Sequence, residues 1–340
     1  MIRFIFLALF ATKLFSTTLE DKISSLFIIG FNGEKAPKSI IEYIKKRELG
    51  GVILFSKNIK DPIQLKKLTS TLKNNSKSKL FIGVDEEGGL VQRLNSKNGF
   101  FDTPKAVDIP KLGQIKARSF YKKMAKMLHN EGINLNFAPV VDLALNKNNQ
   151  VIYKYGRSFG SDPKVVEKYA TIFIDQMKKE GVVSVLKHFP GHGSSTKDSH
   201  KGFVDVTNLY KKIELEPFLN IDANIIMTAH IFNKNIDPNY PATLSKKSID
   251  ILRSHGFDGV ILSDDLQMGA IRKNYDLNQT LSLAINSGVN MLLFGNQLSK
   301  PIDIRTLVNR VKILVNSGKI DIKNIEKSYK RVKRLKEENL

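Results

Sequence analysis

LFIGVDEEGGLVQR, residues 80–93, holds the pattern that decides the fold: a short apolar run that leads directly into charged residues. Residues 80–84 do not alternate between polar and apolar types, which predicts a strand buried on both faces, as in a parallel sheet. Seven further runs have the same character, at residues 26–30, 51–55, 135–139, 182–186, 224–228, 259–263 and 289–295.

Amphipathic segments separate these runs and predict helices, at residues 40–49, 62–73, 121–132, 164–181 and 277–288. Several end in glycine, the residue typical of helix C-termini, at Gly132, Gly181 and Gly288. Eight strands alternating with helices predict an α/β fold that is a single (β/α)8 TIM-type barrel, with any irregularity expected in the first strands. The alternative is an open doubly wound sheet, whose glycine-rich phosphate turn is represented only by Gly30 and Gly33.

The composition narrows the class of protein. The net charge is +21, but the lysines are scattered over the predicted helices, and no motif for nucleic acid accompanies them, so no nucleic-acid partner is expected. The chain has no cysteine, which excludes disulfides, thiolate catalysis, cysteine-based zinc sites and a lipoprotein anchor.

Residues 1–16 are interpreted as a signal peptide that precedes a domain of residues 17–340. Arg3 supplies a positive start and an apolar run of eight residues follows, too short to span a bilayer. We therefore expect a periplasmic or secreted protein with no stable membrane anchor after cleavage. The alternative is that this segment is the first helix or strand of the mature fold, in a cytoplasmic protein.

Polar and charged residues concentrate just after the predicted strands, where a barrel places its chemistry. They include Asp85 and Arg93 after the third strand, Arg157 after the fourth, Lys187, His188 and His192 after the fifth, His230 after the sixth, and Asp264 and Asp265 after the seventh. Of the two adjacent aspartates, Asp265 is expected to cap the following helix.

The segment KHFPGHGSSTKDSH, residues 187–200, contains three of the six histidines. Pro190, Gly191 and Gly193 rule out the helical pairing of two histidines that many metal sites use, although a metal site built on a loop remains an alternative. The other interpretation is acid–base chemistry. In an extended segment Asp198 and His200 point the same way, so the carboxylate can orient the ring and raise its basicity. Asp264 is then the candidate carboxylate nucleophile.

DEEGGLVQR, YGRSF, KHFPGHG, DSH and SDDLQMGA occur in this order at barrel-like spacing, and together they resemble the β-N-acetylhexosaminidases of glycoside hydrolase family 3. The resemblance covers roughly residues 24–300 and is carried chiefly by KHFPGHG followed by DSH. It implies that residues 17–340 form the catalytic domain of a retaining enzyme that uses no metal and no cofactor. The implied reaction removes terminal, non-reducing N-acetylglucosamine from peptidoglycan fragments.

The resemblance also implies individual roles. Asp264 matches the nucleophile, His200 the general acid/base and Asp198 its partner, while Asp85, Arg93, Arg157, Lys187 and His188 match residues that bind the sugar. His192 receives no role: it either orients the loop by hydrogen bonding or is an ordinary polar loop residue. The protein is expected to act as a monomer on N-acetylglucosamine-containing muropeptides.

Two alternatives of different kinds stay open. One is a phosphorylase of the same family, because a neutral histidine would tolerate an incoming phosphate. The other is a non-catalytic scaffold that binds peptidoglycan through its basic surface.

Overall fold

The computed structural model describes residues 17–340. The segment interpreted as a signal peptide, residues 1–16, lies outside the described residues. Within 17–340 no helix has the length and apolar character needed to cross a membrane.

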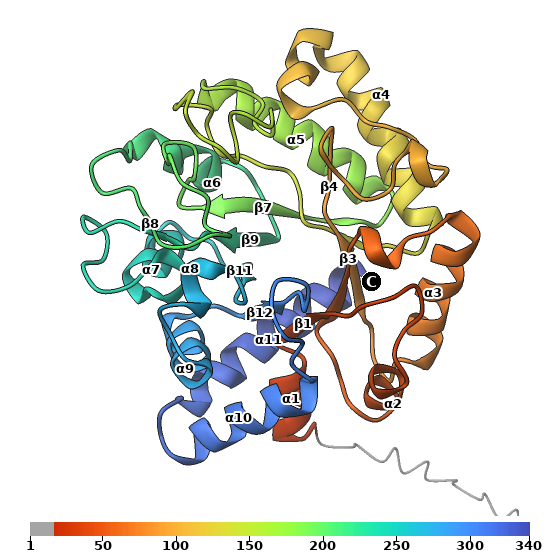
Figure 1. Cartoon of the computed structure of the whole chain (residues 1–340), viewed down its shortest axis with the longest axis vertical. Helices are drawn as coiled ribbons and strands as arrows, with labels where there is room; N and C mark the ends of the chain where they lie inside the picture. The colour runs from red at the N-terminus through yellow and green to blue at the C-terminus, as the bar shows by residue number, and fades with distance from the viewer. Residues whose placement is uncertain (1–16) are drawn as a thin grey trace, which may run out of the picture.

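Eight parallel strands close into one barrel at the centre of the molecule (Figure 1), which confirms the predicted fold class. In chain order they are β1 (Phe27–Gly30), β2 (Gly51–Leu54), β3 (Phe81–Val84), β6 (Leu135–Asn136), β7 (Val183–Phe189), β9 (Ile225–Thr228), β11 (Val260–Asp265) and β12 (Met291–Phe294). Each strand pairs with the next one along the chain, and β12 pairs with β1 to close the ring. All eight apolar runs identified in the sequence therefore supply barrel strands.

The irregular barrel strand is not one of the first strands, where irregularity was expected. The first strands, β1 to β3, are regular four-residue elements, whereas β6 has only two residues. The chain after β6 continues beside β7 through a single bridge between Val140 and Lys187. The expectation of irregular first strands is thus wrong, and the short strand is the fourth.

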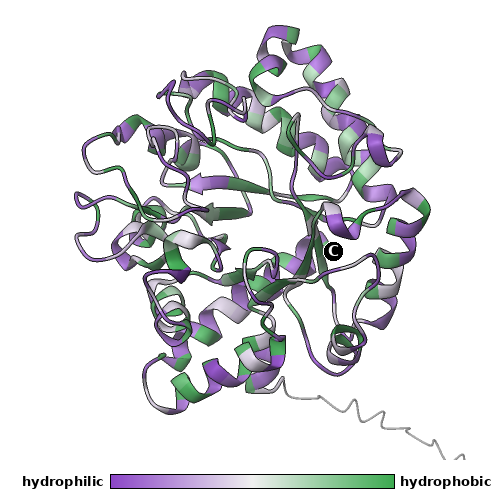
Figure 2. Cartoon of the chain, viewed as in Figure 1, coloured by the Kyte–Doolittle hydropathy of each residue, from purple (hydrophilic) through white to green (hydrophobic). Residues whose placement is uncertain are grey.

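Helices surround the barrel. They are α1 (Leu19–Ser24), α2 (Lys38–Lys46), α3 (Pro62–Asn75), α4 (Ile109–Asn130), α5 (Pro163–Lys179), α6 (Glu216–Asn220), α7 (Lys246–Ser254), α8 (Gly269–Arg272), α9 (Leu277–Ser287), α10 (Ile304–Asn316) and α11 (Ile322–Asn339). Figure 2 shows hydrophobic residues concentrated on the central strands, while the outer helices carry hydrophobic and hydrophilic residues side by side. The longer outer helices therefore bury one face and expose the other.

Local sequence signals place the helix ends. Asp61, Asp162 and Asp276 cap α3, α5 and α9 by accepting backbone N–H groups of the first turn. Gly132 and Gly181 follow α4 and α5 with positive φ, as predicted, and so does Gly288 after α9. α4 begins earlier than the sequence suggested, because its first turns precede a break at Gly113, where φ is 80°.

Two small two-stranded sheets form on the loops that follow barrel strands. β4 (Glu86–Gly88) and β5 (Val91–Gln92) make a hairpin directly after β3. β8 (Val204–Asp205) pairs with β10 (Ile231–Phe232), which joins the loops after β7 and β9. These sheets hold the loops that surround the site described next.

Candidate active site

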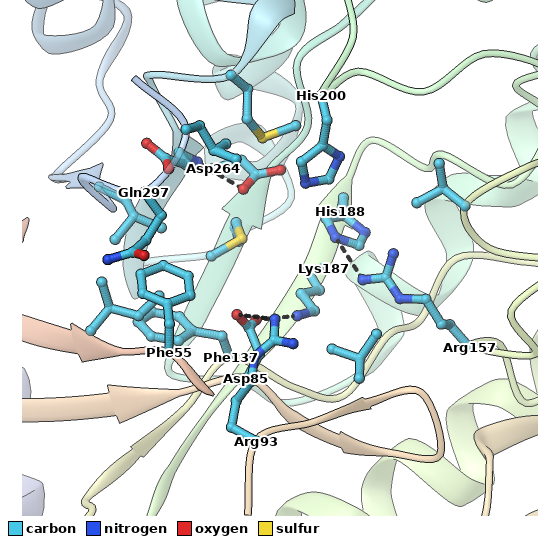
Figure 3. A pocket seen from close by; sticks show the side chains of 18 of the residues that line it. Phe55, Asp85, Arg93, Phe137, Arg157, Lys187, His188, His200, Asp264 and Gln297 are labelled. Carbon is cyan, nitrogen blue, oxygen red and sulfur yellow. Dashed lines mark hydrogen bonds and ion pairs between the residues drawn. The ribbon is translucent and has the colours of Figure 1, made fainter. Parts of the chain in front are cut away.

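One hollow of about 540 Å³ opens at the C-terminal ends of the barrel strands. All eight side chains proposed from the sequence line it: Asp85, Arg93, Arg157, Lys187, His188, Asp198, His200 and Asp264. Apolar side chains, among them Phe55, Phe137 and Met227, complete the wall. In the view of Figure 3, His200 and Asp264 lie at one end of the hollow, and Asp85, Lys187 and Arg93 lie at the other.

A cluster of buried charges forms the second of these ends. Lys187 projects from β7 and its ammonium group contacts two carboxylates, Asp85 at 2.9 Å and Glu87 at 2.7 Å. Arg157 makes a bidentate pair with Glu87, both N–O distances being 2.8 Å. Arg93 reaches the other oxygen of Asp85 at 3.3 Å. Three cations and two carboxylates thus hold one another at the base of the hollow.

Their protonation follows from this arrangement. Burial would raise the pKa of Asp85 and of Glu87, but the neighbouring cations more than offset it. The pKa of Asp85 falls well below its ordinary value because of Lys187 and Arg93, and that of Glu87 falls to about 2. Both carboxylates are therefore ionised at neutral pH and can accept hydrogen bonds from hydroxyl groups.

His188 is oriented by a carboxylate that lies deeper in the protein. Its Nδ1 lies 2.6 Å from Oδ2 of Asp142, a fully buried side chain, and its Nε2 lies 3.4 Å from Arg157 in the wall of the hollow. Asp142 also accepts the backbone N–H of His192 at 2.7 Å. One carboxylate therefore fixes the ring of His188 and the backbone of the loop that follows β7.

His200 and Asp198 form the expected pair. The ring Nδ1 lies 2.8 Å from Oδ1 of Asp198, and the same oxygen accepts the backbone N–H of His200 at 2.9 Å. The ring is half exposed, which leaves its Nε2 edge free toward the hollow (Figure 3). Burial raises the pKa of Asp198, but its hydrogen bonds from His200 outweigh this and leave the pKa below its ordinary value, so the carboxylate is ionised beside the ring.

The loop that carries this pair is held against the segment after β11. The backbone N–H groups of Gly269 and Ala270 donate to the carbonyls of His200 and Ser199, both at 3.1 Å. A Cβ atom on Gly269 would lie 2.6 Å from the His200 carbonyl oxygen, so only glycine permits this approach. The backbone that follows Asp264 thereby sets the position of His200.

The two adjacent aspartates of β11 have different environments. Asp264 faces the hollow, and its Oδ1 accepts the N–H of Asp265 at 2.7 Å. Burial would raise the pKa of Asp264, but the neighbouring His230, His188 and His200 and the N–H of Asp265 outweigh it and leave the pKa below its ordinary value, so Asp264 is ionised at neutral pH. Asp265 accepts the N–H groups of Gln267 and Gly295, and burial raises its pKa to about 6. Asp265 does not cap α8, whose N-cap is Met268 and has no side-chain cap bond, so the capping role expected from the sequence is wrong; Asp265 instead holds the turn that precedes the helix.

The loop between the two histidine motifs is fixed more firmly than its glycine and serine content suggests. Glu214 is fully buried and accepts the N–H groups of Gly193 and Ser194 together with the Ser194 hydroxyl. A Cβ on Gly193 would meet the carbonyl of Leu143 at 1.7 Å. Residues 193–195 are buried and hydrogen-bonded, so this part of the loop is held in place.

His192 orients this loop by hydrogen bonding. The side chain is buried, with Nδ1 2.7 Å from the Ser195 hydroxyl and Nε2 3.4 Å from that of Ser199. Burial lowers its pKa to about 4, so the ring is neutral under ordinary conditions. Of the two roles left open for His192, the structure supports loop orientation.

Residues 18–335 match the model of the glycosyl hydrolase family 3 N-terminal domain. The chain belongs to glycosyl hydrolase family 3.

Named relatives within family 3 are similar over most of this chain. A β-hexosaminidase from Tolumonas auensis is 38% identical over 275 residues, which cover 75% of this chain and 78% of the relative. β-Hexosaminidase A from Pseudoalteromonas piscicida is 33% identical over 88% of this chain. The solved structure of a family 3 β-N-acetylglucosaminidase from Paenibacillus superposes with a TM-score of 0.88 at 31% identity over 95% of this chain. The present chain spans 55% of the Pseudoalteromonas protein and 63% of the Paenibacillus chain.

The three histidines of residues 187–200 each hydrogen-bond to another side chain of this family 3 chain. His188 pairs with Asp142, His192 with two serines and His200 with Asp198. Among residues 17–340, no group of three or more histidine, aspartate or glutamate side chains is arranged to hold a metal ion.

Three buried carboxylates of the site were not selected from the sequence. Glu87 pairs with Arg157 and Lys187, Asp142 pairs with His188, and Glu214 fixes the loop at Gly193. Glu87 stands within DEEGG, and a lysine at a buried strand end, such as Lys187, has to reach either solvent or an acidic partner. Asp142 directly follows Val140 and Val141, which continue the fourth apolar run, so the rule that selects polar residues after a strand could have selected it. Glu214 follows no predicted strand, and no sequence signal marks it.

We predict that Glu87→Gln destabilises the fold by about 3–5 kcal/mol, the usual cost of removing one partner from a buried ion pair. Arg157 would lose its bidentate acceptor, and Lys187 would keep only Asp85. Urea unfolding at pH 7 measures the change in the free energy of unfolding.

Glu42→Gln, on the exposed side of α2, is the matched control and should leave the free energy of unfolding unchanged within about 0.5 kcal/mol. Equal stability of Glu87→Gln and the control would show that the charge cluster does not hold the barrel mouth together.

Proposed function

We propose that this protein is a retaining exo-β-N-acetylglucosaminidase that removes terminal, non-reducing N-acetylglucosamine from peptidoglycan fragments. The observation that carries the proposal is the presence of an ionised Asp264 and a half-exposed His200, oriented by Asp198, in one hollow. The named functions of the family 3 relatives, β-hexosaminidase and β-N-acetylglucosaminidase, support the class of substrate.

In the first step Asp264 attacks the anomeric carbon while His200 donates a proton to the glycosidic oxygen. The bond to the leaving group breaks as the bond to the carboxylate oxygen forms, which gives a covalent glycosyl-enzyme. Asp198 accepts a hydrogen bond from the Nδ1–H group of His200 and stabilises the ring while the ring carries two protons.

In the second step His200 takes a proton from water, and the hydroxide so generated displaces Asp264 from the sugar. Two inversions at one carbon return the original β configuration. An imidazole suits this pair because, unlike a second carboxylate, it does not raise the pKa of Asp264 through like-charge repulsion.

The buried charge cluster is suited to bind the sugar hydroxyls. Asp85 supplies anionic acceptors, and Arg93, Arg157, Lys187 and His188 supply donors around the same end of the hollow. Since these groups already hold one another in place, little side-chain freedom would be lost when the sugar binds.

We predict that Asp264→Ala and His200→Ala each lose most of the hydrolysis of an unactivated β-N-acetylglucosaminide. With an aryl substrate whose leaving group has a low pKa, His200→Ala should recover a large part of the lost rate, because departure then needs little protonation. Asp264→Ala should gain no such recovery. The measurement is kcat/KM for a series of aryl β-N-acetylglucosaminides, and an equal loss of His200→Ala across the series would count against His200 as the acid.

The product analysis tests the reaction class. We expect the β-anomer of N-acetylglucosamine as the first product by proton NMR, with or without inorganic phosphate. Sugar 1-phosphate formed in the presence of phosphate would establish the phosphorylase instead. Absence of turnover with every β-N-acetylglucosaminide, together with retention on peptidoglycan that survives Asp264→Asn, would establish the binding scaffold.

We further propose that the protein acts in the periplasm or outside the cell after removal of residues 1–16. The basic start and the short apolar run of that segment support this placement. N-terminal sequencing of the protein isolated from its own cells should begin near residue 17. A sequence beginning at Met1 would favour the cytoplasmic alternative.

A further inference from the structure

The strand that carries the proposed nucleophile has an irregular register. β11 pairs regularly with β9 along residues 260–263. Toward β12, the pairing includes Leu262 opposite Met291. The next pair is Asp265 opposite Leu293, which lies three residues further along β11 but only two further along β12. β11 therefore contains a bulge of one extra residue, and a bulge bends a strand and redirects the side chains beside it.

Ser263 connects the two strands at this bulge. Its side chain is fully buried, and its hydroxyl oxygen accepts the backbone N–H of Leu293 at 3.0 Å. Just beyond the bulge, Leu266 donates its N–H to the carbonyl of Leu293, also at 3.0 Å. The backbone on both sides of Asp264 is thus fixed to β12.

His230 holds the bulge from the loop after β9, the strand on the other side of β11. Its ring is 1% exposed. Nε2 lies 2.9 Å from the carbonyl oxygen of Asp265, and Nδ1 lies 2.8 Å from the hydroxyl of Thr243. That hydroxyl lies 2.9 Å from the hydroxyl of Thr228 on β9. A chain of buried side chains therefore connects the bulge to β9.

The partners of His230 decide where its proton lies. A carbonyl oxygen can only accept, so Nε2 carries a hydrogen. Burial lowers the pKa of His230, so the ring is neutral at pH 7 and Nδ1 accepts from the Thr243 hydroxyl. Since both ring nitrogens are engaged, His230 is placed to hold the backbone and not to transfer a proton.

The backbone of Asp265 links His230 to the nucleophile. The carbonyl of Asp265 binds His230, and its N–H donates to Oδ1 of Asp264 at 2.7 Å. Holding this residue therefore orients the carboxylate that faces the hollow (Figure 3). Neither His230 nor Ser263 is among the described residues that line the hollow, so both act without touching the sugar.

We propose that His230 and Ser263 are positioning residues that hold the bulge of β11 and thereby aim the carboxylate of Asp264 at the anomeric carbon. This inference rests on the proposed function, since it takes Asp264 as the nucleophile. It goes further by assigning roles to two side chains outside the hollow. Such support matters because a displacement of about 1 Å in an active site can lower the rate about 100-fold.

Kinetics of His230→Leu, His230→Gln and Ser263→Ala in the full chain test this assignment. Leucine fills the space but cannot donate to the Asp265 carbonyl, whereas glutamine carries an amide N–H at a similar reach. Ser263→Ala removes the side-chain acceptor of the Leu293 N–H. The substrate is phenyl β-N-acetylglucosaminide, whose poor leaving group makes formation of the glycosyl-enzyme the slow step. Calorimetry with N-acetylglucosamine measures binding to the hollow separately.

We expect kcat to fall about 100-fold in His230→Leu and about tenfold in Ser263→Ala. KM and the Kd of N-acetylglucosamine should change by less than about twofold, because the side chains that bind the sugar are unaltered. His230→Gln should restore kcat to within about tenfold of the unaltered protein, since it returns a donor to the Asp265 carbonyl.

Thr69→Val is the matched control. The side chain of Thr69 on α3 is buried outside the hollow, and its hydroxyl donates to the carbonyl of Glu131. The substitution removes a buried hydrogen bond of a similar kind without touching β11. It should leave kcat within about twofold of the unaltered protein.

Unchanged kcat in His230→Leu or in Ser263→Ala would remove that residue from the assignment, and unchanged kcat in both would overturn the inference. A parallel rise in KM and Kd would also overturn it, because the substitutions would then disturb the hollow as a whole. If His230→Leu does not fold, Ser263→Ala decides by the same two criteria. The proposed function fails separately: it is wrong if the unaltered protein cleaves no β-N-acetylglucosaminide.

Discussion

The burial of Lys187 is the constraint on which the site depends. An ammonium group that is 3% exposed at the end of a barrel strand requires anionic partners, and both come from the loop after β3. Glu87 forms one ion pair with Lys187 and a second with Arg157, which lies on the long loop after β6. The loops after β3 and β6 are therefore fixed by charge to each other and to β7, and the hollow takes its shape from that arrangement.

Parallel strands made the fold predictable from the sequence. All eight strands lie at apolar runs such as 80–84, because a strand covered by helices on one side and by the barrel interior on the other has no polar face. Helix ends were predictable from neighbouring residues alone, because Asp caps the first turn and Gly adopts the positive φ that follows the last one. The site residues could be predicted because the C-terminal ends of all eight strands meet at one face of a barrel, so residues that directly follow the strands lie close together.

The contacts that join distant parts of the chain could not be found in this way. Asp142 reaches His188 across 46 positions, and Glu214 reaches Gly193 across 21. Gly-Ser-Ser at 193–195 has the composition of a flexible segment, yet buried partners elsewhere in the chain hold it. Glycine and serine content indicates only how flexible an isolated segment would be. The contacts with Glu214 and Asn149 fix the backbone of residues 193–195 in the folded protein.

The two backbone hydrogen bonds from Gly269 and Ala270 to the loop of His200 have an energetic consequence. If each contributes about 1 kcal/mol net, an arrangement with the loop detached would be about 30-fold less populated. The proton donor would then occupy its place beside Asp264 in nearly every molecule before a substrate arrives. Readiness of this kind is set by main-chain groups after β11, in addition to the side-chain contacts of His192 and Glu214 that hold the rest of the loop.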